Sequence, residues 1–206
     1  MRVSKEVKQA TREKILRTAE KLFSEVGYLD TTTRQIAKEA GIAAGTLFNY
    51  FPSKETLAMS LLARAFEQGR EDYQSYRSDE EDLNEELFLL ISSELRRLKP
   101  YRSFVAPVLE STMSIFSKES GCPEGIATRS EHLATVQQAI QNHGFSNVPE
   151  HVATTLYWSL YLGILAFWSS DASRNQEQTL ALIDYSLRVF THTINDTAAQ
   201  EVPNGY

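Results

Sequence analysis

Hydrophobic residues recur every three to four positions along most of the chain, the spacing that places them on one face of an α-helix. The clearest stripe runs from Ile15 to Val26, and Gly27 follows it as a stop. Another helix starts in the acidic stretch 79–86 and stops at Pro100. Similar spacing predicts further helices over residues 32–40, 45–51, 53–76, 103–117, 126–142, 149–170 and 176–195. The pattern therefore predicts an all-α fold.

The first three predicted helices have the lengths and turns of a helix-turn-helix. Thr32 and Gln35 are spaced as a capping box at the start of the second helix, and Gly41 ends that helix. A third short helix follows, and Pro52 stops it. This arrangement is typical of DNA binding through the third helix, although an ordinary helical hairpin has the same spacing.

The last two predicted helices carry more apolar surface than one core face needs. Residues 149–170 are apolar on all sides, and Leu182, Val189 and Ile194 widen the stripe of residues 176–195. This surplus indicates a homodimer interface built as a four-helix bundle, whereas the alternative is that both helices only fill the monomer core. The longest apolar run, residues 156–168, is too short to span a bilayer, so we expect no membrane partner.

The charges are divided unevenly along the chain. The 206 residues have a net charge of −6, which by itself argues against nucleic acid as a partner. Residues 1–54, however, hold 10 Lys and Arg against 6 Asp and Glu, whereas residues 55–206 hold 11 against 21. Such an asymmetry indicates a basic functional end on an acidic body.

The sequence lacks the residues that several kinds of chemistry require. The only cysteine is Cys122, and the four histidines show no metal-ligand spacing, so neither a disulfide nor a metal site is expected. No Ser/His/Asp, Cys/His or phosphate-loop arrangement is present, so we expect neither an enzyme nor a cofactor. The charged N-terminus does not resemble a signal peptide, and we expect a cytoplasmic location.

Residues 12–57 resemble the N-terminal domain of TetR-family transcriptional regulators. The resemblance is carried by Ile15, Leu16, Ala19, Leu22, Phe23, Gly27, Tyr28, residues 31–37, Ala40, Gly41, Ile42, residues 45–55 and Leu57. It implies a homodimer whose third helices enter successive major grooves of a palindromic operator. It also implies a small-molecule pocket in a C-terminal helical domain and, as is usual in the family, repression.

The resemblance further implies which positions face DNA, and the chemistry of each residue type suggests its role. These positions are Thr32, Thr33 and Arg34 for phosphate (Arg34 for a base as well), Gly45 for close backbone approach, Thr46 and Asn49 for bases, and Tyr50 and Lys54 for phosphate. Two positions depart from the family: Ala43 provides no cap for the third helix, and Phe48 lacks the hydroxyl of the usual tyrosine. Leu47 and Phe51 are expected in the core.

An effector site is implied among the helices from Phe88 to Trp168. The large side chains that could line it, or could instead be ordinary core, are Phe88, Tyr101, Phe104, Met113, Phe116, Trp158 and Tyr161. A cavity lined by them would suit an apolar or aromatic compound.

These expectations combine into one description of the chain. Residues 1–54 form a helix-turn-helix DNA-binding domain, residues 55–196 an effector-binding and dimerisation domain, and residues 197–206 a flexible tail. The expected function is that of a ligand-responsive transcriptional regulator, a repressor, with double-stranded DNA, a small molecule and a second copy as partners. The alternative is a helical interaction or scaffold protein of the same fold that no longer reads DNA, which Phe48 and the net charge of −6 would support.

Overall fold

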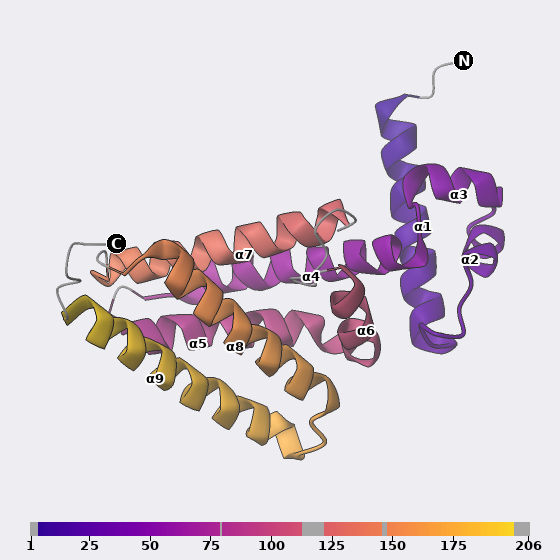
Figure 1. Ribbon diagram of the computed structural model, residues 1–206. Helices are drawn as coiled ribbons and strands as arrows, with labels where there is room; N and C mark the ends of the chain where they lie inside the picture. The colour runs from indigo at the N-terminus through magenta and orange to yellow at the C-terminus, as the bar shows by residue number, and fades with distance from the viewer. Residues whose placement is uncertain (1–3, 79, 113–121, 146–147, 200–206) are drawn as a thin grey trace. The chain divides into compact units, whose positions relative to one another are not determined.

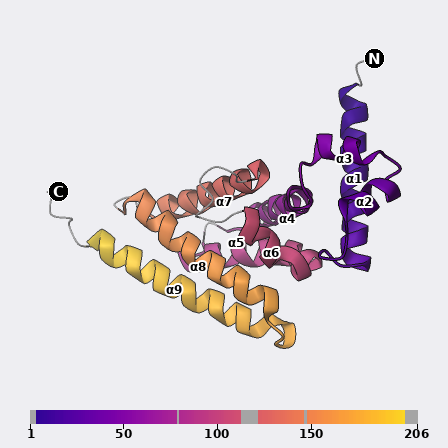
Figure 2. The same cartoon turned by 45° about the vertical axis from the view of Figure 1, so that its right-hand side comes forward.

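The computed structural model describes residues 4–78, 80–112, 122–145 and 148–199. Within these ranges every regular element is helical (Figures 1 and 2), and the all-α prediction is confirmed. The elements are α1 (Lys5–Glu25), α2 (Thr33–Glu39), α3 (Ala44–Tyr50), α4 (Lys54–Tyr76), α5 (Leu83–Leu98), α6 (Arg102–Thr112), α7 (Pro123–Asn142), α8 (Glu150–Ser170) and α9 (Glu177–Ala199), with short 3-10 helices at Lys99–Tyr101 and Arg174–Gln176.

The chain folds into two compact units whose bounds do not follow a single cut in the sequence. Unit 1 comprises Met1–Ala65 and Pro100–Ala127, and unit 2 comprises Phe66–Lys99 and Thr128–Tyr206. Helices α4 and α7 each contribute residues to both units, and α6 belongs with α1, α2 and α3. The border that the sequence suggested after residue 54 therefore lies inside unit 1.

Local signals place the helix ends of unit 1. The Thr32 hydroxyl accepts from the Gln35 backbone N–H (3.2 Å), and the Gln35 side chain accepts from the Thr32 N–H (2.7 Å), so the predicted capping box is present. Helix α3 begins after Ala43 without a side-chain cap, as the sequence indicated. Leu47 and Phe51 are fully buried, which confirms that both belong to the core.

Two boundaries differ from the sequence prediction, and a third falls outside the described residues. Helix α7 begins at Pro123, earlier than expected, because proline fits the first turn of a helix, where its missing N–H is not needed. Helix α9 continues to Ala199, so residues 197–199 of the expected tail are helical. The end of the helix predicted over 103–117 lies outside the described residues after Thr112.

Helix α8 of unit 2 is buried along one side. Figures 1 and 2 show α8 and α9 lying side by side and antiparallel. Among the described residues, α8 alone is long and apolar enough to cross a membrane by length and composition, a property that core helices of soluble proteins share. Tyr157, Tyr161 and Trp168 are at most 2% exposed, so one face of α8 packs as a core helix does.

Candidate functional site

The turn between α2 and α3 has the geometry that joins the two helices of a helix-turn-helix. Gly41 has a φ of +63°, a conformation that side chains disfavour, and its N–H donates to the Lys38 carbonyl (3.0 Å). The Ile42 N–H donates to the Ala37 carbonyl (3.0 Å), which closes the end of α2. The turn therefore sets the direction in which α3 leaves.

Most of the residues that the sequence assigned to DNA lie at the surface of α2 and α3. Arg34, Gly45 and Asn49 are exposed, and Thr46 and Tyr50 are half-buried. A Cβ added at Gly45 would meet no atom within 4 Å, so nothing in the described chain requires a glycine there. The structure thus places these five residues on two short consecutive helices.

The two threonines at the start of α2 differ in position: Thr32 is the N-cap, and Thr33 is the first helical residue. The hydroxyl of Thr32 is already engaged in the capping box, where it also donates to the side-chain oxygen of Gln35 (2.9 Å). Thr33 is half-buried at the first helical position. Phe48, which replaces the tyrosine usual in the family, is 46% exposed on α3.

Lys54 has a structural contact that the sequence did not indicate. Its ammonium donates to the backbone carbonyls of Tyr28 (2.8 Å), Leu29 (3.2 Å) and Thr31 (3.1 Å), and it lies 4.5 Å from the centroid of the Tyr28 ring. All three N–H donors of the ammonium are therefore used within the protein. Burial, helped by the nearby Glu55 carboxylate, raises the pKa of the Tyr28 hydroxyl to about 12.

Arg12 links α1 to the end of α3. Its guanidinium lies 5.0 Å from the centroid of the Phe51 ring, donates to the Ser60 hydroxyl (3.3 Å) and lies 3.9 Å from a carboxylate oxygen of Glu124. Sequence reasoning missed this position because Arg12 looks like an ordinary residue on the polar face of α1. Arg12 therefore packs on Phe51, the C-cap residue of α3, and is itself held by Ser60 and Glu124.

Two of the residues expected at an effector site pack within unit 1. The Phe104 ring lies 5.4 Å from the rings of both Phe23 and Tyr28, and Tyr101 lies 5.8 Å from Phe104. The Tyr101 hydroxyl donates to Glu20 (2.5 Å), and burial, with this bond, raises the pKa of that hydroxyl. Tyr101 and Phe104 therefore hold α6 against α1.

Unit 2 contains a buried polar cluster on α5, α7 and α8. The Glu94 carboxylate is fully buried, accepts from the Tyr161 hydroxyl (2.5 Å) and lies 2.9 Å from Nδ1 of His132. The other ring nitrogen of His132 lies 3.1 Å from the Tyr157 hydroxyl. Burial, followed by the Glu94 charge, raises the pKa of both tyrosines well above the ordinary value.

Trp158 lies beside this cluster. Its ring centroid is 5.6 Å from that of Tyr161 and 6.1 Å from that of His132, and the Arg129 guanidinium lies 5.1 Å from it. Its indole Nε1 is buried and has no hydrogen-bond partner among the residues that the structure describes. A buried donor without a partner is costly, so this atom is one that a ligand could satisfy.

The remaining expected effector residues are elsewhere. Phe88 is half-buried and lines a separate cleft of about 350 Å³ with Leu89 of α5 and Leu187 of α9. Met113 and Phe116 lie outside the described residues. Of the five described positions, only Trp158 and Tyr161 contact the buried polar cluster.

Helices α8 and α9 also expose apolar residues on their outer faces. Val152 and Phe167 of α8 and Leu180 and Val189 of α9 are each at least 40% exposed. Gly163 is exposed in the middle of α8, and a Cβ built on it would meet nothing within 4 Å. Among the described residues, no group of three or more His, Cys, Asp and Glu is placed to hold a metal ion.

Family models match both the N-terminal and the C-terminal part of the chain. Residues 15–61 match "Bacterial regulatory proteins, tetR family", and residues 87–204 match "Tetracyclin repressor-like, C-terminal domain". The transcriptional regulator YuxN of Bacillus subtilis is 50% identical over 48 residues, 23% of this chain and 16% of its own. The transcriptional repressor KstR of Rhodococcus jostii is 42% identical over 65 residues, 32% of this chain and 31% of its own. The chain thus aligns with less than a third of either relative.

Solved structures resemble the chain over nearly its whole length. Thermus thermophilus FadR, a transcriptional repressor solved in complex with lauroyl-CoA, has a TM-score of 0.69 at 19% identity, over 95% of this chain and 99% of its own. A TetR regulator of Nitrosomonas europaea has a TM-score of 0.64 at 20% identity, over 88% of this chain and 98% of its own. At these identities the likeness shows the fold. Because the C-terminal family match alone covers more than half of the residues, the chain belongs to the tetR family of bacterial transcriptional regulators.

Proposed function

We propose that this chain is a ligand-responsive repressor that binds a palindromic operator as a homodimer and that a small molecule modulates this binding. The observation that carries the proposal is the set of exposed Arg34 and Asn49 and half-buried Thr46 on two helices whose turn is fixed by Gly41. In this proposal residues 1–54 provide the DNA contacts, and residues 55–196 provide effector binding and dimerisation.

The DNA contacts divide into two kinds. Asn49 and Thr46 read bases in the major groove, since an Asn amide can bond adenine at two atoms and a Thr can bond a base or touch a thymine methyl. Arg34, the backbone around Thr33 and the hydroxyl of Tyr50 contact phosphates, which fix register. Gly45 lets the backbone approach closely, which is supported by the open space where its Cβ would be. Lys54 contributes charge, because its donors are already used.

The dimer forms through α8 and α9. Support comes from their exposed apolar residues, Val152, Phe167, Leu180 and Val189, which a second copy would bury. Gly163 would let the two copies of α8 approach closely, since nothing in the described chain occupies the space beside it. The resulting bundle of four helices matches the symmetry of a palindromic operator.

The effector binds next to the buried cluster of unit 2. Trp158 and Tyr161 supply aromatic surface, and the unpartnered indole Nε1 of Trp158 favours a compound that carries a hydrogen-bond acceptor. Phe88 lines a separate cleft and is a weaker member of this set. The regulator works in the cytoplasm, where bacterial DNA is, and acts by binding, without catalysis.

The first test is selection of fragments from the DNA of the source organism by the purified full-length protein across a salt series. Enrichment of one palindrome, with affinity that falls steeply as salt rises, is the expected result. Recovery of unrelated fragments, or of none, would contradict repression by the unliganded protein and leave a regulator that needs a bound co-effector or the scaffold alternative. Genes beside the enriched site would then name candidate effectors.

A substitution tests base reading directly. Asn49→Ala should cost about 1–3 kcal/mol of binding to the selected palindrome and relax the sequence preference at one position. Asn142→Ala, which removes another exposed asparagine at the end of α7, serves as the matched control and should leave binding unchanged. Equal binding by both variants would show that Asn49 reads no base.

A further inference from the structure

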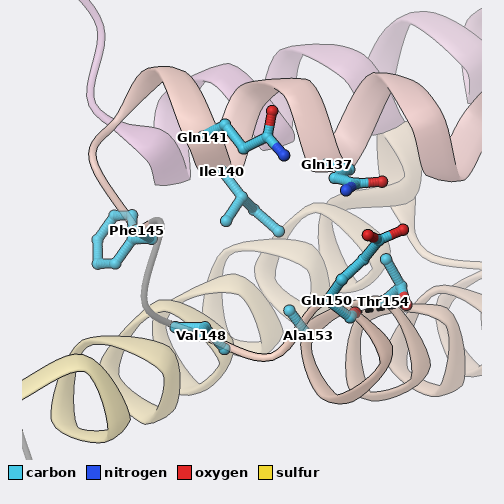
Figure 3. Close-up of a pocket in the computed structure, with 8 residues that line it drawn as sticks. All are labelled: Gln137, Ile140, Gln141, Phe145, Val148, Glu150, Ala153 and Thr154. Atoms are coloured by element: carbon cyan, nitrogen blue, oxygen red, sulfur yellow. Dashed lines mark hydrogen bonds between the residues drawn. The ribbon is translucent and has the colours of Figure 1, made fainter. Parts of the chain in front are cut away.

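A pocket that the proposed function does not use lies within unit 2, between the second half of α7 and the first turns of α8 (Figure 3). Its volume is about 480 Å³, within the range of small-molecule sites. The side chains of Ile140, Val148 and Ala153, each at most 8% exposed, form its apolar part, and the half-buried ring of Phe145 closes one end. The pocket can therefore take up an apolar group the size of a short alkyl chain.

Three polar side chains at this pocket are free. Gln137 and Gln141 come from α7, and Glu150 comes from the first turn of α8 (Figure 3). Within the described part of the chain, none of these three side chains makes a hydrogen bond or an ion pair; Glu150 is bonded only through its backbone carbonyl, by Thr154 (2.7 Å). Their polar atoms remain available to a ligand.

The charge of the pocket selects the class of ligand. Among the described residues that line it, Glu150 is the only charged one, and unit 2 is acidic, with 17 Asp and Glu against 8 Lys and Arg. An anion at the first turn of α8 would have to displace the Glu150 carboxylate, which already complements the helix dipole there. A cation meets an attractive field both locally and from the whole unit.

The pocket is separate from the surfaces used in the proposed function. On α8, Glu150, Ala153 and Thr154 face α7, whereas Val152 and Gly163 of the proposed dimer face point to the opposite side of the helix. Trp158 and Tyr161 do not line it. A ligand here would leave both the second copy and the first effector site in place.

We propose that this pocket binds an organic cation, with the ammonium at the Glu150 carboxylate, the amides of Gln137 and Gln141 as further partners, and an apolar body over Ile140, Val148 and Ala153. This goes beyond the proposed function, because it assigns a second ligand site to the regulator. One carboxylate, two amides and the apolar part of the pocket together fit a ligand that has a cationic group and an apolar body.

The test is a titration of the full-length protein with n-hexylamine, followed by NMR of the Ile, Val and Ala methyl groups, with 1-hexanol and hexanoate as comparison probes. The expected result is saturable shifts at Ile140, Val148 and Ala153, with binding of hexylamine tighter than that of hexanol and hexanoate weakest. Glu150→Gln should weaken hexylamine by about two- to five-fold, the range of an exposed ion pair, and leave hexanol unchanged. Added salt should reduce this difference.

Glu177→Gln is the matched control, because Glu177 is likewise an exposed glutamate in the first turn of a helix, α9. It should leave hexylamine binding unchanged. No saturable shift, equal binding of the three probes, or equal weakening by both variants would overturn the proposal. Operator binding by Glu150→Gln should equal that of the wild type, so a failure of this site is distinguishable from a failure of DNA binding.

Discussion

Lys54 connects the start of α4 to the turn after α1, and replacing it by methionine tests this role. The ammonium donates to the carbonyls of Tyr28, Leu29 and Thr31, at distances between 2.8 and 3.2 Å. Methionine keeps most of the apolar stem but removes the charge and all three donors. The carbonyl oxygens then have to find water or remain unpaired.

The loss can be estimated from the burial of each partner. Hydrogen bonds that involve a charged group contribute about 1.5–3 kcal/mol each when buried. Leu29 is exposed, so its carbonyl can be hydrated in the variant, and the bonds to Tyr28 and Thr31 are only partly buried. The contact with the Tyr28 ring adds about 0.5–1 kcal/mol. We therefore expect Lys54→Met to lower the free energy of unfolding by about 2–3 kcal/mol.

Urea denaturation monitored by circular dichroism measures this change, with the midpoint falling and the slope unchanged. Lys21→Met is the control, because Lys21 is an exposed lysine of the same unit whose ion pair with Glu39 (3.6 Å) contributes at most about 1 kcal/mol. The dependence of operator affinity on salt is measured in parallel, at a temperature at which both variants are folded.

If Lys54 contacted a DNA phosphate instead, its substitution would give a different result. If the Lys54 ammonium bound phosphate, Lys54→Met would reduce the slope of log affinity against log salt by about one and leave stability nearly unchanged. That outcome would refute the structural role argued from the three hydrogen bonds. A loss of stability of about 2–3 kcal/mol would support it, whatever the change in slope.

Three further substitutions test local features, each by urea denaturation. Gly69→Ala should destabilise the protein by about 1–3 kcal/mol, since its Cβ would lie 2.6 Å from the Cα of Glu94, and an unchanged midpoint would contradict this close approach. Thr32→Ala should cost about 1 kcal/mol by removing the cap of α2, whereas a wild-type midpoint would show the cap to be unimportant. Hydrogen bonds from Thr179 and then Ser173 hold the pKa of Asp171 well below its usual range, so its carboxylate stabilises the fold above the unfolded pKa of about 4, and this contribution is lost as pH falls. The stability deficit of Asp171→Asn should therefore be constant above about pH 5 and shrink below pH 4, and a deficit independent of pH would contradict the argument.

The sequence predicted the helices and the helix-turn-helix because both depend on neighbouring residues. The stripe from Ile15 to Phe23, the capping box at Thr32 and the stop at Gly41 are all signals within one or two helical turns. The family pattern over residues 12–57 is also contiguous, so its buried positions, Leu47 and Phe51, could be assigned without coordinates. Some helix ends, at Pro123 and Ala199, were misplaced, because the ends depend on weak local preferences.

Only the tertiary structure decided which side chains meet. Lys54 looked like a free cation, and its partners lie 23 to 26 residues earlier in the chain. Phe104 looked like part of an effector pocket but packs on Phe23, and the buried Glu94 meets Tyr161, 67 residues away. Hydrophobic periodicity is a property of one helix and tells which face is buried, whereas the choice of partner depends on how the helices pack, which no local pattern encodes.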